Sequence, residues 1–459
     1  MIGIILTIIS IFLFQNKRYS ISITLFFLFI TNGFQLIPSS VLLSGLPIDK
    51  TSDLAIIFSS IVIFLNLSSF TYILKQEKVF KLLFGYFIFI CLDFIYSYYI
   101  LNYDVSGIFK VFRAHVLLLS FAIFFLVPTS SLLKVLHIIF CITIFQSILF
   151  LFQLITGQII LLSSTPGSEV GTNTVEGFKE YTRFYNLPTY LNATLFYFLF
   201  VYNFKNKLYK VIILLIISVT IIAPLHRSYI ISILCVISLY IFLKQQSGVK
   251  FIYLFIIGTL TYSLTFIEII NHRLNEAFSD ISKTFSAKSI NSIDPTENTL
   301  NFRVAHFYER FEYLLNKPDG WLFGIGLISD NSKEADRLRF ETGLTNEKLN
   351  RVTQIDSADL VWSPLMLQTG LLGTILYGVL MFYMMYFFSK EKTNQYGVIG
   401  YLCIVEAFFV SMLGTDMIQN SFKIMIILLA VISSKIYRNE KSRQFNHNVH
   451  DSNKKYFYA

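Results

Sequence analysis

Long apolar stretches follow one another along almost the whole chain, and short polar connectors separate them. A helix that crosses the hydrocarbon core of a bilayer needs about 20 apolar residues, because no water is present there to bind exposed backbone groups. The composition fits this environment, since 54% of the residues are hydrophobic and only 14% are charged. So few charges cannot cover soluble domains of this length with polar surface. The sequence therefore predicts an all-α, polytopic transmembrane protein.

The apolar stretches divide the chain into about 12 to 13 predicted spans. They cover residues 2–14, 20–36, 54–74, 82–101, 111–127, 132–155, 189–204, 211–223, 229–243, 251–270, 360–388, 398–413 and 422–437. These spans predict the domain organisation. The first ten helices occupy 1–270, a large and partly helical loop occupies 271–358, the last three helices occupy 359–437, and a basic tail occupies 438–459.

Lysines and arginines predict the orientation of these spans. They concentrate in short connectors and in the C-terminal tail, and positive residues favour the cytoplasmic side. With the tail inside, three loops fall on the opposite side, namely 158–188, 224–228 and 271–357. Only Lys110 and Arg113 disagree, which indicates either a misplaced fifth span or a function. This distribution explains the net charge of +9 without a nucleic-acid partner.

A few polar residues lie inside predicted spans. Asp93, Arg113, His115 and Glu406 are costly to bury in lipid, so they should face a cavity or pair with one another. We predict an Asp93–Arg113 pair between adjacent spans. The four cysteines also lie in apolar stretches and form no CxxC pair, which indicates small buried hydrophobes and no metal site.

Three arginines mark the predicted outer face. Arg183 lies in the sequence Arg-Phe-Tyr-Asn-Leu-Pro, Arg227 lies in His-Arg-Ser at the start of a span, and Arg303 opens the helical part of the large loop. Each alone is explained equally well as a snorkelling side chain that anchors its helix. As a group they favour another role, because a guanidinium stays charged and its planar donor fork fits phosphate oxygens. We predict that they bind a lipid-linked diphosphate.

The large loop contains a predicted amphipathic helix and a glycine turn. The helix should stop at the sequence Lys-Pro-Asp-Gly that begins at residue 317, and its apolar face should be formed by Phe307, Phe311, Leu314 and Leu315. The following Gly324 and Gly326 are not a nucleotide fingerprint, because the third glycine and the strand-turn-helix frame are missing. We expect a helix that lies flat on the membrane and a turn where two backbones pass closely.

Two carboxylates, Asp356 and Asp359, stand where the large loop enters the next span, about three turns before Gly370-Leu371-Leu372-Gly373. They are three residues apart and therefore share a helix face. One interpretation is a cap at the helix N-terminus, where the helix dipole favours an acid. The other is a general base or a group that orients an acceptor hydroxyl. Asp356 suits the cap better, and Asp359 suits the base better.

The ordered set of these motifs resembles the O-antigen polymerase and O-antigen ligase superfamily, from about Arg183 to the last span. The resemblance implies a GT-C-like, membrane-embedded glycosyltransferase that needs no metal or other cofactor and uses an undecaprenyl-diphosphate-linked glycan as donor. It assigns Arg183, Arg227 and Arg303 to the diphosphate. It also implies a bacterial cytoplasmic (inner) membrane protein with the large loop in the periplasm, and it adds a chain-length regulator and a flippase as candidate partners.

One departure bears on the choice within that superfamily. Ligases carry a His-Asn pair at the mouth of the span after the large loop, where this chain has Asp359-Leu360. This favours a polymerase of O-antigen, capsule or exopolysaccharide repeat units over a ligase that transfers glycan to a lipid A-core acceptor. A carboxylate is a weaker proton acceptor than a histidine near neutral pH, so His306 and His226 are candidate substitutes. For His306, surface packing is the alternative.

A flippase or other transporter for lipid-linked oligosaccharides is the rival from another class. Transporters generally contain internal repeats and place their binding residues near the bilayer midplane. This chain shows no repeat, and its polar motifs gather on one predicted face. The sequence therefore favours the polymerase.

Overall fold

A computed structural model describes residues 1–46, 48, 50–76, 78–163, 170–175, 178–244, scattered residues between 251 and 284, 294–346, 351–355, 360–390, 394–412 and 414–457. In this part the chain is mostly helical, and its strands form two short hairpins. Most of the predicted span 251–270 lies outside the described residues. The prediction of a helical protein with several long apolar helices that could span a membrane is confirmed.

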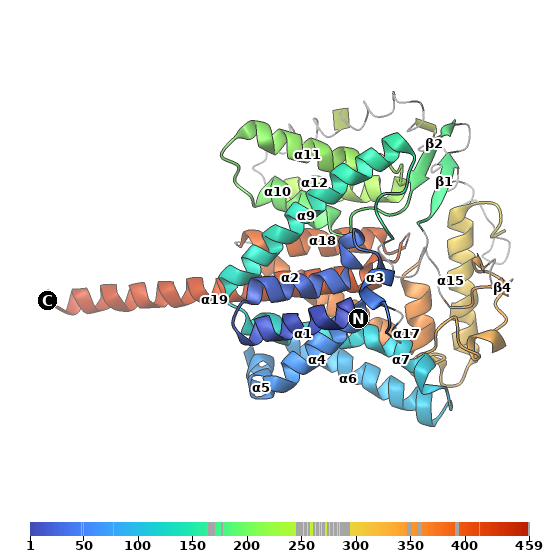
Figure 1. Cartoon of the computed structure of the whole chain (residues 1–459), viewed down its shortest axis with the longest axis horizontal. Helices are drawn as coiled ribbons and strands as arrows, with labels where there is room; N and C mark the ends of the chain where they lie inside the picture. The colour runs from blue at the N-terminus through green and yellow to red at the C-terminus, as the bar shows by residue number, and fades with distance from the viewer. Residues whose placement is uncertain are drawn as a thin grey trace.

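Apolar helices pack side by side in the body of the molecule (Figure 1). The first half of the chain contributes α1 (Ile2–Gln15), α2 (Tyr19–Ile30), η1 (Gly33–Gln35), α3 (Ser39–Leu43), α4 (Ser52–Leu65), α5 (Leu67–Gln76), α6 (Lys78–Tyr99), α7 (Val105–Val116), η2 (Leu117–Leu119), α8 (Ser120–Leu126) and α9 (Thr129–Thr156). The second half contributes α10 (Leu191–Phe200), α11 (Lys207–Ile222), α12 (Arg227–Lys244), α17 (Trp362–Lys390), α18 (Gln395–Val410), η5 (Asp416–Ile418) and α19 (Asn420–Phe457).

Five helical segments in the described part are long and apolar enough to cross a membrane: α6, the continuous unit Val105–Leu126, α9, α17 and the first part of α19. The predicted span 54–74 is broken, because α4 and α5 meet at a bend of 89°. Shorter apolar helices coincide with other predicted spans, among them α1, α2, α10 and α18. The predicted number of spans therefore depends on whether these short helices also cross.

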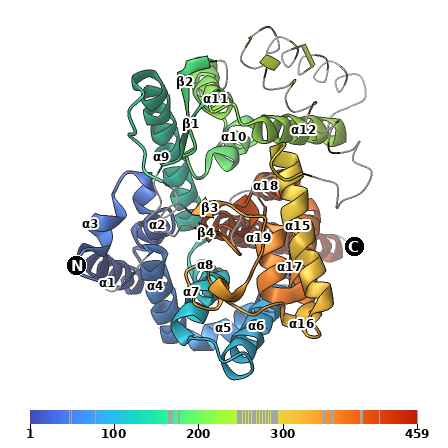
Figure 2. The ribbon, with the colours of Figure 1, turned by 90° about the vertical axis from the view of Figure 1, so that its right-hand side faces the viewer.

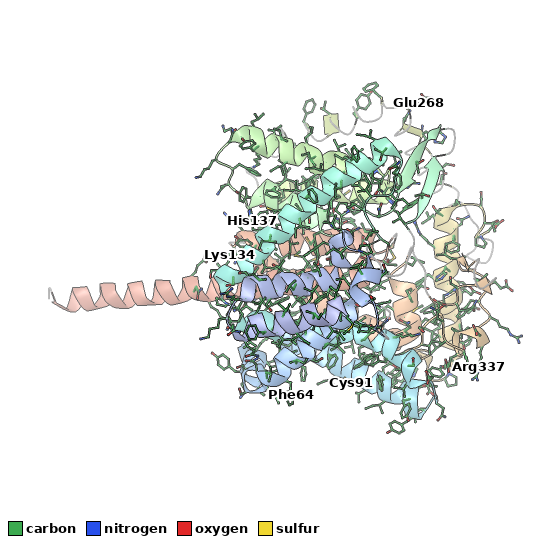
Figure 3. All side chains as sticks on the ribbon, in the orientation of Figure 1. Phe64, Cys91, Lys134, His137, Glu268 and Arg337 are labelled. Atoms are coloured by element: carbon green, nitrogen blue, oxygen red, sulfur yellow. The ribbon has the colours of Figure 1, made fainter. Side chains whose placement is uncertain are left out.

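The two ends of the molecule differ. The helix α19 leaves one end (Figure 1), and Lys134 lies toward that end, whereas Arg337 of the large loop lies at the opposite end (Figure 3). In α19, Lys435 Nζ donates to the carbonyls of Phe125, at 2.7 Å, and of Val127, at the C-terminal end of α8. A cation is favoured there by the helix dipole. Elements of two loops predicted to be outside lie at the opposite end, namely β1 (Thr172–Val175), β2 (Phe178–Phe184), α15 (Thr299–Asn316) and α16 (Gly320–Phe323).

The fifth predicted span was placed too late. The helix begins at Val105 instead of residue 111, so Lys110 and Arg113 lie within it. The predicted Asp93–Arg113 pair is also wrong, because Arg113 Nη1 lies 2.5 Å from Asp53 Oδ2. Asp53 stands in the first turn of α4, which packs against α7. Asp93 instead accepts a hydrogen bond from Ser97 Oγ, one turn along the same helix, at 3.4 Å.

The helix α15 ends at Asn316, as predicted, and packs against α17 at the end of the molecule that faces the viewer in Figure 2. Its buried face differs from the predicted one. Leu314 is buried, but Leu315 is 60% exposed, and His306 and Arg310 are fully buried in place of phenylalanines. The reason is that Arg310 finds partners within the large loop. Its guanidinium donates to Gln354 O at 3.1 Å and to Glu309 at 2.9 Å.

The predicted close approach of two backbones occurs at Gly324, and its partner is the glycine motif of α17. Gly324 has φ +59° and Gly370 has φ +72°, a region that glycine enters without strain. A Cβ on Gly324 would stand 2.1 Å from Leu367 O. Ile325 N donates to the same carbonyl at 2.8 Å. The cap, defined here as residues 294–346 and 351–355, is therefore docked on α17 through its backbone.

Candidate functional site

A cavity of about 560 Å³ lies between α10, α12, α18, η5 and the start of α19. Its volume falls in the range that is typical of small-molecule sites, roughly 300–1,000 Å³. The wall includes Tyr185 and Pro188 from the motif at Arg183, and His226 from the motif at Arg227. Glu406 and Asp416 add two carboxylates. The cavity therefore brings together parts of the chain that are far apart in sequence.

The segment after Arg183 is fixed by Gln35, which is fully buried and has φ +56°. Gln35 Nε2 donates to Leu187 O at 3.1 Å, and Gln35 Oε1 accepts from Thr189 N and Oγ1 at 3.1 and 2.9 Å. Holding a non-glycine residue in this left-handed region costs of order 1–3 kcal/mol, which surrounding contacts must offset. The hydrogen bonds of Gln35 supply such contacts, and Thr189 in turn lines the cavity.

Arg183 joins the first two predicted arginine motifs. Its Nε donates to Pro224 O at 2.8 Å, and its guanidinium lies 5.1 Å from the centre of the Tyr185 ring. The Tyr185 ring in turn meets the His226 ring edge to face at 5.0 Å. Arg183 thus stands behind the cavity wall and ties it to the turn before α12. The side chain of Arg227, at the start of α12, lies outside the described residues.

The two carboxylates of the cavity have different surroundings. Glu406 Oε1 accepts from Ser232 Oγ at 3.4 Å, and Asn192 also bonds this carboxylate. Asp416 lies in η5, outside the apolar helices, and accepts from Gln419 Nε2 at 3.2 Å. Enclosure away from bulk water raises the pKa of Asp416. The two acids are close enough for their charges to interact.

Two predicted residues, Arg303 and His306, lie on α15 and do not line this cavity. His306 is fully buried, and its Nδ1 lies 2.9 Å from the hydroxyl of Ser363 in the first turn of α17. Burial and the neighbouring Arg310 lower the pKa of His306 to about 3. The interpretation as a surface-packed histidine is therefore wrong, and burial also makes His306 a weak proton acceptor. The end of α15 away from α16 points toward α12 (Figure 2).

Asp356 and Asp359 lie outside the described residues. The chain resumes close to the cavity, because Val361 N donates to Ser411 O at 3.4 Å and Trp362 Nε1 donates to Ser411 Oγ at 3.0 Å. Ser411 directly follows Val410, a residue of the cavity wall. The proposed roles of both aspartates stay predictions.

Sequence reasoning missed Asp416 and Gln419. Both belong to the short connector between the last two spans, and that connector contains a carboxylate that no basic residue accompanies. It also missed Arg310, one of the largest fully buried side chains in the described structure. Among the described residues, no group of three or more His, Cys, Asp and Glu side chains is arranged to hold a metal ion. The expected independence from metals stays a prediction.

Fold and cavity together define a class: a mostly helical chain with several apolar helices that could span a membrane and a polar cavity among their ends. In comparisons with known proteins, no protein-family model matches this chain, and no curated protein matches it significantly. The resemblance to the polymerase and ligase superfamily therefore depends on the sequence motifs alone.

Proposed function

We propose that this chain is a GT-C-like, membrane-embedded glycosyltransferase that polymerises undecaprenyl-diphosphate-linked repeat units at the outer face of a bacterial inner membrane. The observation that carries the proposal is the composition of the cavity wall. It combines the segment after Arg183, the turn before Arg227 and two carboxylates. Transfer from a diphosphate to a hydroxyl requires an anion-binding group and a proton acceptor. The arginines that flank these wall segments are proposed for the first role, and the carboxylates inside the cavity for the second.

In the proposed reaction, arginines bind the diphosphate of the lipid-linked donor chain. They stabilise the negative charge that develops on the diphosphate as it leaves the sugar. Fixed donors in a site with little water contribute about 3 kcal/mol each to such stabilisation. The acceptor is a hydroxyl of a second lipid-linked repeat unit. The proposed reaction needs no metal ion. A chain-length regulator and a flippase remain candidate partners.

The test replaces single arginines in cells that make the polymer. We expect Arg227→Ala and Arg303→Ala to abolish polymer while single repeat units still reach the cell surface. The matched control is Arg337→Ala, an exposed arginine of the same large loop, which should leave polymer length unchanged. The amount of each variant in the membrane is measured in parallel.

Other outcomes would indicate the alternative functions. If the chain is a flippase, its inactive variants should leave no repeat units at the outer face. If the chain is a ligase, its inactive variants should accumulate complete lipid-linked polymer that stays unattached. Normal polymer length in both arginine variants, or in a strain that lacks the chain, contradicts the polymerase proposal.

A further inference from the structure

The described part of the cavity wall is acidic. Among the described residues of its wall there is no lysine or arginine, whereas Glu406 and Asp416 are both present. A diphosphate carries negative charge, and carboxylates in an enclosed space repel it. Arg183 lies against Tyr185 of the wall and donates to Pro224 O, and it does not itself line the cavity. The described wall therefore suits a neutral group with many hydroxyls better than it suits the leaving diphosphate.

Neutral polar side chains share the wall with these acids. Asn192, Tyr229 and Gln419 line the cavity and carry hydrogen-bond donors and acceptors. A sugar presents hydroxyls that both donate and accept hydrogen bonds, so such a wall fits a sugar.

We propose that this cavity binds the acceptor sugar and that Asp416 is its general base; this inference rests on the proposed polymerase function. The acceptor O–H bond breaks, and its proton moves to the Asp416 carboxylate. The acceptor oxygen forms a bond to the anomeric carbon of the donor. The bond from that carbon to the diphosphate oxygen breaks, and its electron pair leaves with the diphosphate. Asp416 then releases the proton to water.

Asp416 fits this role better than Glu406 does. Glu406 is only 4% exposed, lies within α18 and is held by Ser232 and Asn192 from two other helices. Asp416 lies in the turn η5 and is only half-buried, and it accepts a hydrogen bond from the nearby Gln419. The carboxylate of Asp416 is therefore better placed to accept a proton and to return it to water.

The experiment uses the full chain in proteoliposomes, with lipid-linked repeat units extracted from a strain that lacks the chain. We expect Asp416→Asn to lower the rate of polymer formation 100-fold or more, the usual contribution of a general base. The variant keeps the shape of the side chain and an oxygen for Gln419.

Dependence on pH adds a second measurement. The native rate should fall as the pH falls through the raised pKa of Asp416, because the protonated acid cannot accept a proton. Asp416→Asn should lack this decline. The other titratable residues that line the cavity are Glu406, His226, Cys403, Tyr185, Tyr190 and Tyr229, and Asp416→Asn leaves them unchanged. Any decline due to them would persist in the variant.

The control is Glu312→Gln, which removes an exposed carboxylate from α15 and should leave the rate unchanged. If the native chain forms no polymer from these repeat units, the proposed function itself fails. If the native chain forms polymer and Asp416→Asn works within 3-fold of it, only this inference fails. If Asp416→Asn does not accumulate, a native pH profile without an acid decline overturns the inference.

Discussion

The cavity and the cap both bury charged side chains, but the surroundings of these side chains differ. In the cap, Arg310 is fully buried and finds Gln354 O, Glu309 and the Phe340 ring within its own region. In the cavity, Glu406 and Asp416 share a wall that surrounds open volume. Removing one partner of a buried charge pair destabilises a fold, whereas a charge beside open volume can also meet a ligand. Substitutions in the cap should therefore lower stability, whereas substitutions in the cavity should mainly change polymer formation.

The largest effect is expected where the cap docks on α17. Gly324→Ala would place a Cβ 2.1 Å from Leu367 O at a φ of +59°. The clash and the strained backbone together should lower the free energy of unfolding of the docked cap by roughly 4 kcal/mol. Thermal unfolding in detergent and protease cleavage within the cap measure this loss.

The matched control for this glycine is Gly378→Ala in α17, where a Cβ would meet no atom within 4 Å. Alanine favours a helix interior over glycine by about 1 kcal/mol, so this variant should be at least as stable as the native chain. Equal behaviour of the two variants would show that the backbones do not cross at Gly324.

A smaller effect is expected at the buried arginine of the cap. Arg310→Met keeps much of the side-chain volume but removes the hydrogen bonds that Arg310 donates to Glu309 and to Gln354 O. Removing one partner of a buried charged network costs about 3 kcal/mol. The melting temperature should fall and cleavage of the cap should increase. The exposed Arg337 is the control, and Arg337→Met should change stability by less than about 0.5 kcal/mol.

Elements that depend on local composition can be predicted from the sequence, and features that depend on tertiary packing cannot. Helices such as α6 and α9 depend on local apolar composition, and they appear where the sequence predicts them. The 89° bend between α4 and α5 and the Asp53–Arg113 pair depend on tertiary packing, which local composition does not encode. The same limit explains the face of α15, where the pattern of phenylalanines was a weaker guide than the partners of Arg310.

In the candidate site, too, some features can be predicted from local sequence and others depend on packing. Single motifs such as the one at Arg183 could be recognised from residue types and from their predicted side of the membrane. Asp416 could not, because one acid in a short connector is an ordinary feature until the fold places it in one cavity wall with residues of α10 and α12. The contact between Arg183 and Pro224 also required the structure, since 41 residues separate the two.

The third prediction concerns pH and the cap. Burial and Arg310 lower the pKa of His306 from 6.5 to about 3, so the unfolded chain binds more protons between these values. The contribution of His306 is fully present above pH 6.5 and is lost as the pH falls toward 3, by up to about 1.4 kcal/mol per pH unit. Unfolding of the cap measured from pH 7 to pH 4 should show this slope.

The control replaces the titrating ring. His306→Gln retains groups that can bond Ser363 but binds no proton in this range. Its unfolding should depend less steeply on pH than that of the native chain. Identical slopes would mean that His306 is not the group responsible and that its burial is smaller than described.

The smallest effect on stability is expected in the cavity. Glu406→Gln keeps a carbonyl oxygen that can accept from Ser232, so the free energy of unfolding should change by less than about 1 kcal/mol. Polymer formation should nevertheless require a higher concentration of repeat units, because the cavity loses one charged acceptor for sugar hydroxyls. Thermal unfolding and the rate at several substrate concentrations measure the two quantities separately. If Glu406→Gln destabilises the chain as much as Arg310→Met does, the acid is a structural partner like those of the cap, and the distinction between the two regions fails.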